Sequence, residues 1–130
     1  MPHTNLQMST KIKILLFLVS LAILSPLLLR QTPKARVIKV VDGDTLRVIF
    51  EGRKEYVRLV GIDAPPLERG GRVAKDFLSK LCPVGSVINL KILGRDRYGR
   101  LLAVVYNENG INVNQRMLEE GLAVSFYQLG

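Results

Sequence analysis

Two aspartates and two arginines in three short motifs are the residues of this chain best suited to chemistry. Asp44 lies in Val-Asp-Gly-Asp-Thr at 41–45, Arg58 and Asp63 lie in Val-Arg-Leu-Val-Gly-Ile-Asp-Ala-Pro at 57–65, and Arg100 ends Asp-Arg-Tyr-Gly-Arg at 96–100. Carboxylate oxygens are ligands of hard cations, and a guanidinium offers paired donors to the oxygens of a phosphate. These four residues therefore have the parts of a metal-assisted phosphodiesterase.

Each motif also has a purely structural interpretation. Asp42-Gly43-Asp44 has the composition of a turn, and residues 96–100 have that of a hairpin turn. Arg58, placed in a predicted strand, could be a surface partner of Glu51 or Glu55 on a neighbouring position. Taken singly, the motifs do not distinguish a metal and phosphate site from ordinary turns and surface ion pairs.

The length of 130 residues leaves room for one small domain and an appendage, and not for two hydrophobic cores. We expect residues 1–35 to be the appendage and residues 36–130 to be the domain. The net charge of +8 is shared between them, and the domain holds fifteen basic and eleven acidic residues. This mild excess permits a polyanionic partner without requiring one. The single cysteine, Cys82, excludes an intramolecular disulfide, and its place on the apolar side of a predicted helix indicates a buried thiol.

An apolar run precedes the domain. Residues 14–29 are apolar except for two serines and one proline, and Lys11 and Lys13 stand just before them. Such a run is typical of a signal peptide or of a single membrane anchor. Sixteen helical residues span only about 24 Å, against a hydrocarbon core of about 30 Å. Because the one small-residue cleavage motif, Ser20-Leu21-Ala22, lies inside the run, we expect an uncleaved anchor, and an exported protein if the run is cleaved.

The hydrophobic pattern of the domain predicts three strands, a helix, two more strands and a second helix. Branched and alternating residues indicate the strands, and Pro65-Pro66 ends the third of them. Asn112 and Gln115 have the spacing of a capping box. The expected strands are 37–41, 45–50, 53–62, 86–93 and 100–106, and the expected helices are 73–81 and 112–121. This order suits a five-stranded Greek-key barrel of the OB type with helices, an α+β fold preceded by one N-terminal hydrophobic helix.

Together the motifs resemble those of a known family, the thermonucleases or staphylococcal nuclease-like domains. The resemblance covers about residues 36–127 and includes Asn-Val-Asn at 112–114 and Glu-Gly-Leu-Ala at 120–123. The fold of that family is an OB barrel carrying helices, in agreement with the pattern of strands and helices above. Family members usually continue into a further helix, and the present sequence ends at Gly130.

The resemblance implies a Ca²⁺-dependent nuclease that hydrolyses DNA or RNA with little sequence preference, and we expect a monomer. It assigns Asp44, Asp63 and the backbone carbonyl of Ala64 to the Ca²⁺ ion. It assigns Arg58 and Arg100 to the scissile phosphate. The supporting residues that it implies are Asp42 and Thr45, and the nucleotide contacts are Tyr98 and Tyr127.

Several of the remaining residues keep two interpretations. Tyr98 and Tyr127 are as suitable for packing against the barrel as for contacting a nucleotide. Lys91, Arg95 and Arg97 either trace a nucleic-acid groove or form a solvated charged edge.

One position departs from the pattern of the family. An Asp-Ala-Pro-Glu run in the family supplies a glutamate that orients or deprotonates the attacking water, and here that position is Pro66. A proline side chain has neither an acid nor a base. Glu68 lies within about 7 Å of extended chain and is the candidate base. The alternatives are activation of water by the metal alone, a domain that binds nucleic acid or nucleotides without efficient hydrolysis, and a structural or protein-interaction domain.

Overall fold

The computed structural model describes residues 7–29 and 32–127, which fall into two compact units, 1–31 and 32–130. The first unit contains one helix, α1, Thr10–Leu29. Its start is capped by Ser9, whose Oγ accepts a hydrogen bond from the Ile12 amide at 3.3 Å. The described side chains of α1, up to Ile23, are exposed. In the ranges given above, no helix combines the length and the apolar character needed to cross a membrane.

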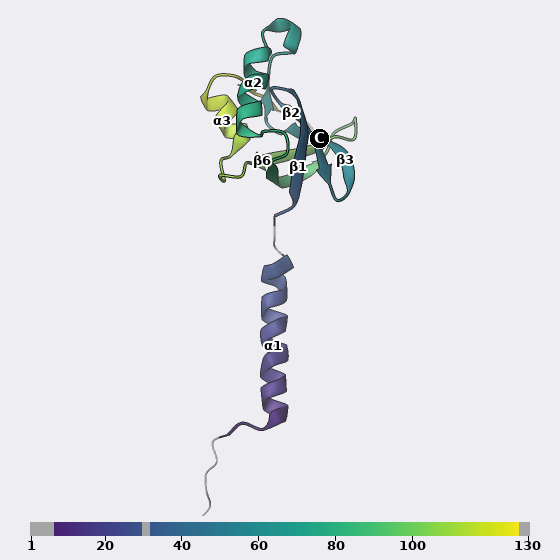
Figure 1. The fold of residues 1–130 in the computed structure, drawn as a ribbon, viewed down its shortest axis with the longest axis vertical. Helices are drawn as coiled ribbons and strands as arrows, with labels where there is room; N and C mark the ends of the chain where they lie inside the picture. The colour runs from purple at the N-terminus through teal and green to yellow at the C-terminus, as the bar shows by residue number, and fades with distance from the viewer. Residues whose placement is uncertain (1–6, 30–31, 128–130) are drawn as a thin grey trace, which may run out of the picture. The chain divides into compact units, whose positions relative to one another are not determined.

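The second unit is a closed five-stranded barrel with helices (Figure 1). Its strands follow one another around the barrel in the order β1-β2-β3-β6-β5, and β5 closes it by pairing with β1. The β3–β6 pair is parallel and the others are antiparallel. The predicted OB-type Greek-key barrel is therefore confirmed. The strand bounds are β1 Lys34–Asp42, β2 Thr45–Phe50, β3 Arg53–Leu59, β5 Val87–Arg95 and β6 Leu101–Tyr106.

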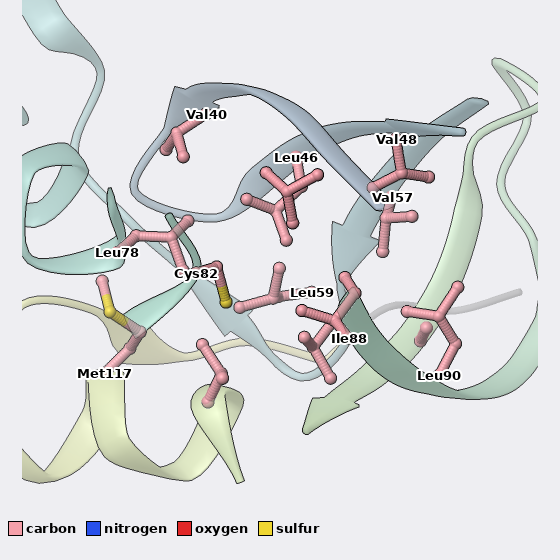
Figure 2. Packing of buried hydrophobic residues seen from close by; sticks show 14 of the residues in the cluster. Val40, Leu46, Val48, Val57, Leu59, Leu78, Cys82, Ile88, Leu90 and Met117 are labelled. Carbon is pink, nitrogen blue, oxygen red and sulfur yellow. The ribbon is translucent and has the colours of Figure 1, made fainter. Parts of the chain in front are cut away.

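The barrel interior is filled by aliphatic side chains from alternate strand positions (Figure 2). Leu46 and Val48 of β2 face inward, and so do Val57 and Leu59 of β3, because successive side chains of a strand point to opposite faces. Residues between them, such as Arg47 and Tyr56, lie on the outer face. The outer face of β2 and β3 is where the functional residues lie.

Two helices cover part of the barrel. The helices α2, Arg72–Leu81, and α3, Val113–Glu119, pack against each other, and they contact β1 and β6, respectively. Figure 2 shows Leu78 and Cys82 of the α2 segment facing the strand side chains of the core. Cys82 is fully buried, as predicted, and burial raises the pKa of its thiol to about 12.

The cap of α3 forms only half of the predicted capping box. The Asn112 side chain accepts a hydrogen bond from the Gln115 amide at 3.1 Å, as an N-cap residue does. The Gln115 side chain instead donates to Glu119, so it does not return to the cap. The helix ends before Gly121, whose φ of +69° is in the left-handed region.

The predicted third strand, 53–62, is wrong at its end. The strand β3 stops at Leu59, and Gly61 turns the chain with a φ of +79°. A separate short strand, β4, Ile62–Asp63, pairs with β7, Val124–Ser125, outside the barrel. Alternation of apolar residues continues through this turn, which is why the sequence pattern did not reveal it. The turn carries Asp63 back toward Arg58.

Candidate active site

The turn between β1 and β2 buries Asp44. The Asp42 carboxylate accepts a hydrogen bond from the Asp44 amide at 3.1 Å, which stabilises the turn. A Cβ atom on Gly43 would lie 2.6 Å from the Cβ of Ala74 and 2.7 Å from that of Ala64, so only glycine fits between them. Residues 42–44 therefore form the predicted turn and also carry the predicted metal ligand Asp44. Packing of α2 and Ala64 against Gly43 holds this turn in place.

Every oxygen of the buried Asp44 carboxylate has a partner. Its Oδ1 accepts a hydrogen bond from the Thr45 hydroxyl at 2.9 Å, and its Oδ2 accepts one from the Ala64 amide, also at 2.9 Å. The Arg58 Nη2 lies 3.4 Å from the same Oδ2. Asp44 is only 6% exposed, so its charge is compensated by these contacts rather than by water. Thr45 thus contacts Asp44 directly, and its supporting role stays a prediction.

Arg58 joins the two aspartates. Its Nη1 donates to the carbonyl oxygens of Leu59 and Ile62 at 2.9 and 2.8 Å, and its Nη2 donates to the Asp63 Oδ1 at 3.2 Å. The alternative of a surface pair between Arg58 and Glu55 is wrong, because Glu55 pairs with Arg95 at 3.0 Å. Arg58 lies on the outer face of β3 but is buried, because the turn after β3 covers it. Two carboxylate oxygens that contact one guanidinium nitrogen are close neighbours, so Asp44 and Asp63 come together.

The donors around Asp44 and Asp63 fit a hard cation. Among residues 7–29 and 32–127, no group of three or more histidine, cysteine or acidic side chains could hold a metal ion. The protein thus offers two carboxylates, of which Asp63 is 52% exposed through its side chain. Ca²⁺ takes carboxylates together with carbonyl oxygens and water, so these two side chains would supply part of its ligands. Ala64 contacts Asp44 through its amide, and its carbonyl as a third ligand stays a prediction.

Asp42 is a neighbour of this pair. Its carboxylate is partly buried, and this burial raises its pKa, to which a hydrogen bond with the Asp44 side chain also contributes. The anionic form of Asp42 is therefore less favoured than in water. A divalent cation beside it would favour the anion again, which suits the supporting role predicted for it.

Arg100 is oriented by the loop that precedes β6. The Asp96 carboxylate accepts hydrogen bonds from the amides of Tyr98 and Arg100, each at 2.9 Å, and from the Arg100 Nε at 2.6 Å. Burial acts to raise the pKa of Asp96, but the hydrogen bonds from Arg100 and Tyr98 outweigh it and lower that pKa. The parallel register sets Leu102 beside Arg58, and Arg100 precedes Leu102 by two positions, just ahead of β6. No hydrogen bond or ion pair joins the two arginines to a common partner within the described residues.

Pro66 and Glu68 lie in the loop after Asp63. The Pro66 carbonyl accepts hydrogen bonds from the amides of Arg69 and Gly71 at 2.9 and 3.0 Å, which close the 3₁₀ turn η1, Leu67–Arg69. Glu68 is exposed on this turn, and its side chain forms no hydrogen bond or ion pair in the part of the chain that the structure describes. Its role as the base stays a prediction. A cavity of about 240 Å³ beside the loop is lined by residues 63–66 and 121–124.

The two tyrosines predicted to contact a nucleotide face solvent. Tyr98 and Tyr127 are 68% and 92% exposed, so neither is a packing residue of the core. Arg97 lies over the Tyr98 ring at 4.9 Å from its centroid and donates to its hydroxyl. Arg95 is bound to Glu55 and to the Gly99 carbonyl, so it belongs to a structural ion pair at the edge of the barrel.

Asn114 is a buried residue whose part the sequence did not reveal. Its Nδ2 donates to the carbonyl oxygens of Val60 and Ala103 at 2.9 and 3.1 Å, and its Oδ1 accepts from the Val105 amide at 3.0 Å. Asn114 therefore fixes the turn after β3 to β6 and so positions Asp63. The sequence does place the Asn114 side chain on the apolar side of a predicted helix, between Val113 and Met117. A polar side chain in such a place needs buried hydrogen-bond partners, and this was the signal for its part.

Comparison with known proteins identifies the family to which the chain is similar. A family model described as "Staphylococcal nuclease homologue" matches residues 56–129. An "Uncharacterized endonuclease" of Escherichia coli is 40% identical over 94 residues, which are 72% of this chain and 61% of that protein. One of Haemophilus influenzae is 41% identical over 101 residues, covering 76% and 56% of the two chains. The "Thermonuclease" of Staphylococcus hyicus is 33% identical over 102 residues, covering 72% and 60%. The chain thus spans about three fifths of the length of these relatives.

Proposed function

The chain belongs to the family of staphylococcal nuclease homologues, and from this premise we propose that it is a Ca²⁺-dependent nuclease that hydrolyses the phosphodiester bonds of DNA or RNA. The observation that carries the proposal is the contact of the buried Arg58 with both Asp44 and Asp63. This contact brings two hard anionic ligands and a guanidinium to one place. The names of the relatives, endonuclease and thermonuclease, support the same activity.

Asp44 and Asp63 would hold the ion, with the Ala64 carbonyl as a further ligand. A bound Ca²⁺ ion supplies Lewis-acid polarisation of a phosphoryl oxygen and a site at which water is oriented. Asp44 is rigid, since its oxygens accept hydrogen bonds from Thr45 and Ala64. Asp63 is half exposed and lines the cavity, so it is the ligand nearer to the substrate.

The two arginines have different freedom to act on the phosphate. Arg58 directs Nη1 to two backbone carbonyls and Nη2 to the carboxylates, so it supplies a fixed positive charge and orients the ligands. Arg100 is held by Asp96 through Nε, which leaves its two terminal nitrogens to face a substrate. Paired donors of this kind stabilise the charge that builds on phosphate oxygens in the transition state.

A second candidate function is a domain that binds nucleic acid or nucleotides and hydrolyses them poorly. The observation that favours it is Pro66, which has no group able to accept a proton from water. General-base assistance contributes about 10² to 10⁴ in rate, so its loss would slow the reaction and leave binding intact. Glu68 on the exposed turn η1 is the candidate that could restore it.

A nuclease assay on the full chain separates the two functions. We expect cleavage of single-stranded DNA in Ca²⁺ and none in EDTA. Asp63→Asn should lower the rate by about a hundred-fold or more, on the scale of losing one group that stabilises a transition state. Asp76→Asn, which removes an exposed acid from α2, is the matched control and should leave the rate unchanged. Binding without turnover in Ca²⁺ would favour the second candidate, and equal rates for both variants would overturn the assignment of the metal ligands.

We propose in addition that residues 14–29 direct the chain to a membrane, either as an anchor or as a signal peptide that is removed. The composition of this run and the lysines before it support the proposal. The intact mass of the protein from membrane and soluble fractions tests it. A chain of full mass recovered only from the soluble cell fraction would contradict both forms of the proposal.

A further inference from the structure

The outer face of β1, β2 and β3 carries a row of side chains next to the candidate active site. Pairing sets Asp42, Thr45 and Arg58 side by side. Two positions along β2 and β3, and three along β1 because its register shifts between Val40 and Asp42, it sets Lys39, Arg47 and Tyr56 side by side. We call these last three residues the flanking row. Because strands rise about 3.4 Å per residue, the flanking row lies about 7 Å from the row that holds Arg58.

A β-bulge puts Lys39 on this face. The register of β1 against β2 shifts between Val37 and Lys39, so that Arg36 and Lys39, three residues apart, both pair with outward positions of β2. Without the extra residue at this point, side-chain alternation would turn Lys39 inward. Beyond the flanking row the next pairing sets Arg36, Ile49 and Lys54 together. These two rows therefore carry four basic residues and no acidic one.

The flanking row combines a stacked aromatic ring with positive charge. The Arg47 guanidinium lies over the Tyr56 ring at 4.0 Å from its centroid, and Tyr56 remains 43% exposed. Lys39 is exposed beside Arg47. The pairing of β3 with β6 begins with Val57 and Leu101, and Tyr56 and Arg100 are the residues just before this pair. The nearest acid of β3, Glu55, forms its ion pair with Arg95 and with no residue of the flanking row.

We propose that the flanking row binds the single strand of nucleic acid that adjoins the scissile phosphate. Arg47 and Lys39 contact its phosphates, and one unstacked base lies on the Tyr56–Arg47 pair. Aromatic rings and guanidinium planes are surfaces on which single-stranded bases stack, and basic side chains follow the backbone. Base-paired strands keep their bases stacked inside the duplex, so this arrangement favours single strands. The proposal rests on the proposed function only for the position of the scissile phosphate.

Binding of a twelve-nucleotide single strand to the full chain in EDTA tests the proposal without cleavage. Tyr56→Ala should weaken binding about five- to a hundred-fold, which is the usual loss of one stacked base. The double variant Lys39→Gln/Arg47→Gln should flatten the slope of log affinity against log salt by about 1.4, since each phosphate contact on a single strand contributes about 0.7. The control Lys75→Gln/Lys80→Gln removes the same charge from α2 and should leave the slope unchanged.

Hydrolysis of bis(p-nitrophenyl) phosphate in Ca²⁺ reports on the catalytic centre alone. The flanking-row variants should hydrolyse this small ester as the wild type does, because it carries neither the neighbouring phosphates nor the bases that the flanking row binds. Failure of every variant and of the wild type to hydrolyse it would contradict the proposed function and leave the binding result valid. The inference itself is overturned if the flanking-row variants bind the twelve-mer as tightly as the control, or if Tyr56→Ala weakens duplex binding equally.

Discussion

Pro66→Glu is expected to raise the rate of hydrolysis. Pro66 has φ −63° and ψ 155°, an extended conformation that glutamate adopts without strain. The position is exposed, so the amide that the substitution introduces is solvated. The two hydrogen bonds to the Pro66 carbonyl come from backbone amides and persist. The loop should therefore keep its path, and the free energy of unfolding should fall only by the roughly 0.4 to 1 kcal/mol that proline contributes through the unfolded chain.

The expected gain in hydrolysis rate follows from the position of residue 66 beside the proposed metal ligands. Position 66 lines the same cavity as Asp63 and Ala64, so an introduced carboxylate would lie beside the proposed metal ligands, where a bound Ca²⁺ ion would orient water. General-base assistance of about 10² to 10⁴ corresponds to about 2.7 to 5.5 kcal/mol of activation free energy. We expect kcat on single-stranded DNA in Ca²⁺ to rise by that factor with little change in KM.

Two control variants make the result decisive. Pro66→Gln changes the backbone and the size of the side chain in the same way but supplies no base. Glu68→Gln should slow the wild type if Glu68 is the present base, and should have little effect in the Pro66→Glu background. A Pro66→Glu variant no faster than Pro66→Gln would refute the argument that this position lacks only a base.

Three further predictions concern packing, acid stability and the thiol. Gly43→Ala should lower the free energy of unfolding by roughly 1 to 3 kcal/mol through overpacking against Ala64 and Ala74, and an unchanged urea midpoint would contradict this. Burial acts to raise the pKa of Asp96, but the hydrogen bonds from Arg100 outweigh it and lower that pKa. Ionised Asp96 therefore stabilises the folded protein fully above the ordinary pKa of 3.8, and this stabilisation is lost as the pH falls below it. The difference in urea midpoint between wild type and Asp96→Asn should accordingly shrink below about pH 4, and a constant difference would count against the ion pair. Because the pKa of its thiol is about 12, Cys82 should resist alkylation by iodoacetamide at pH 8 in the folded chain and should be alkylated in urea. Equal alkylation rates in the folded and the urea-unfolded chain would show that the thiol is accessible.

The barrel could be predicted because its signals are local. Inward residues such as Leu46 and Val57 alternate with polar ones, and the turns between the first three strands contain glycine. The break of the third strand could not be predicted in this way. Gly61 interrupts an apolar run without changing its character, and the carbonyl of Val60 is taken by Asn114, which is 54 residues away in the chain.

The site was predicted as a set of residues and not as an arrangement. Motif order indicated Asp44, Asp63, Arg58 and Arg100, but the hydrogen bonds of Arg58 to the turn after β3 depend on the fold of that turn. Its burial on an outward strand position also depends on this covering turn. Sequence alternation alone would have left Arg58 in solvent.

The sequence by itself determined the fold class, the residue types available for a metal ion and a phosphate, and the absence of an acid at position 66. These are properties of single residues and of short-range patterns, which a chain carries before it folds. The tertiary structure alone decided that one guanidinium contacts both aspartates, that Tyr98 and Tyr127 face solvent, and that a bulge aligns Lys39 with Arg47 and Tyr56. Each of these depends on strand register and on contacts between distant segments, because a shift of one residue moves a side chain to the other face of the sheet.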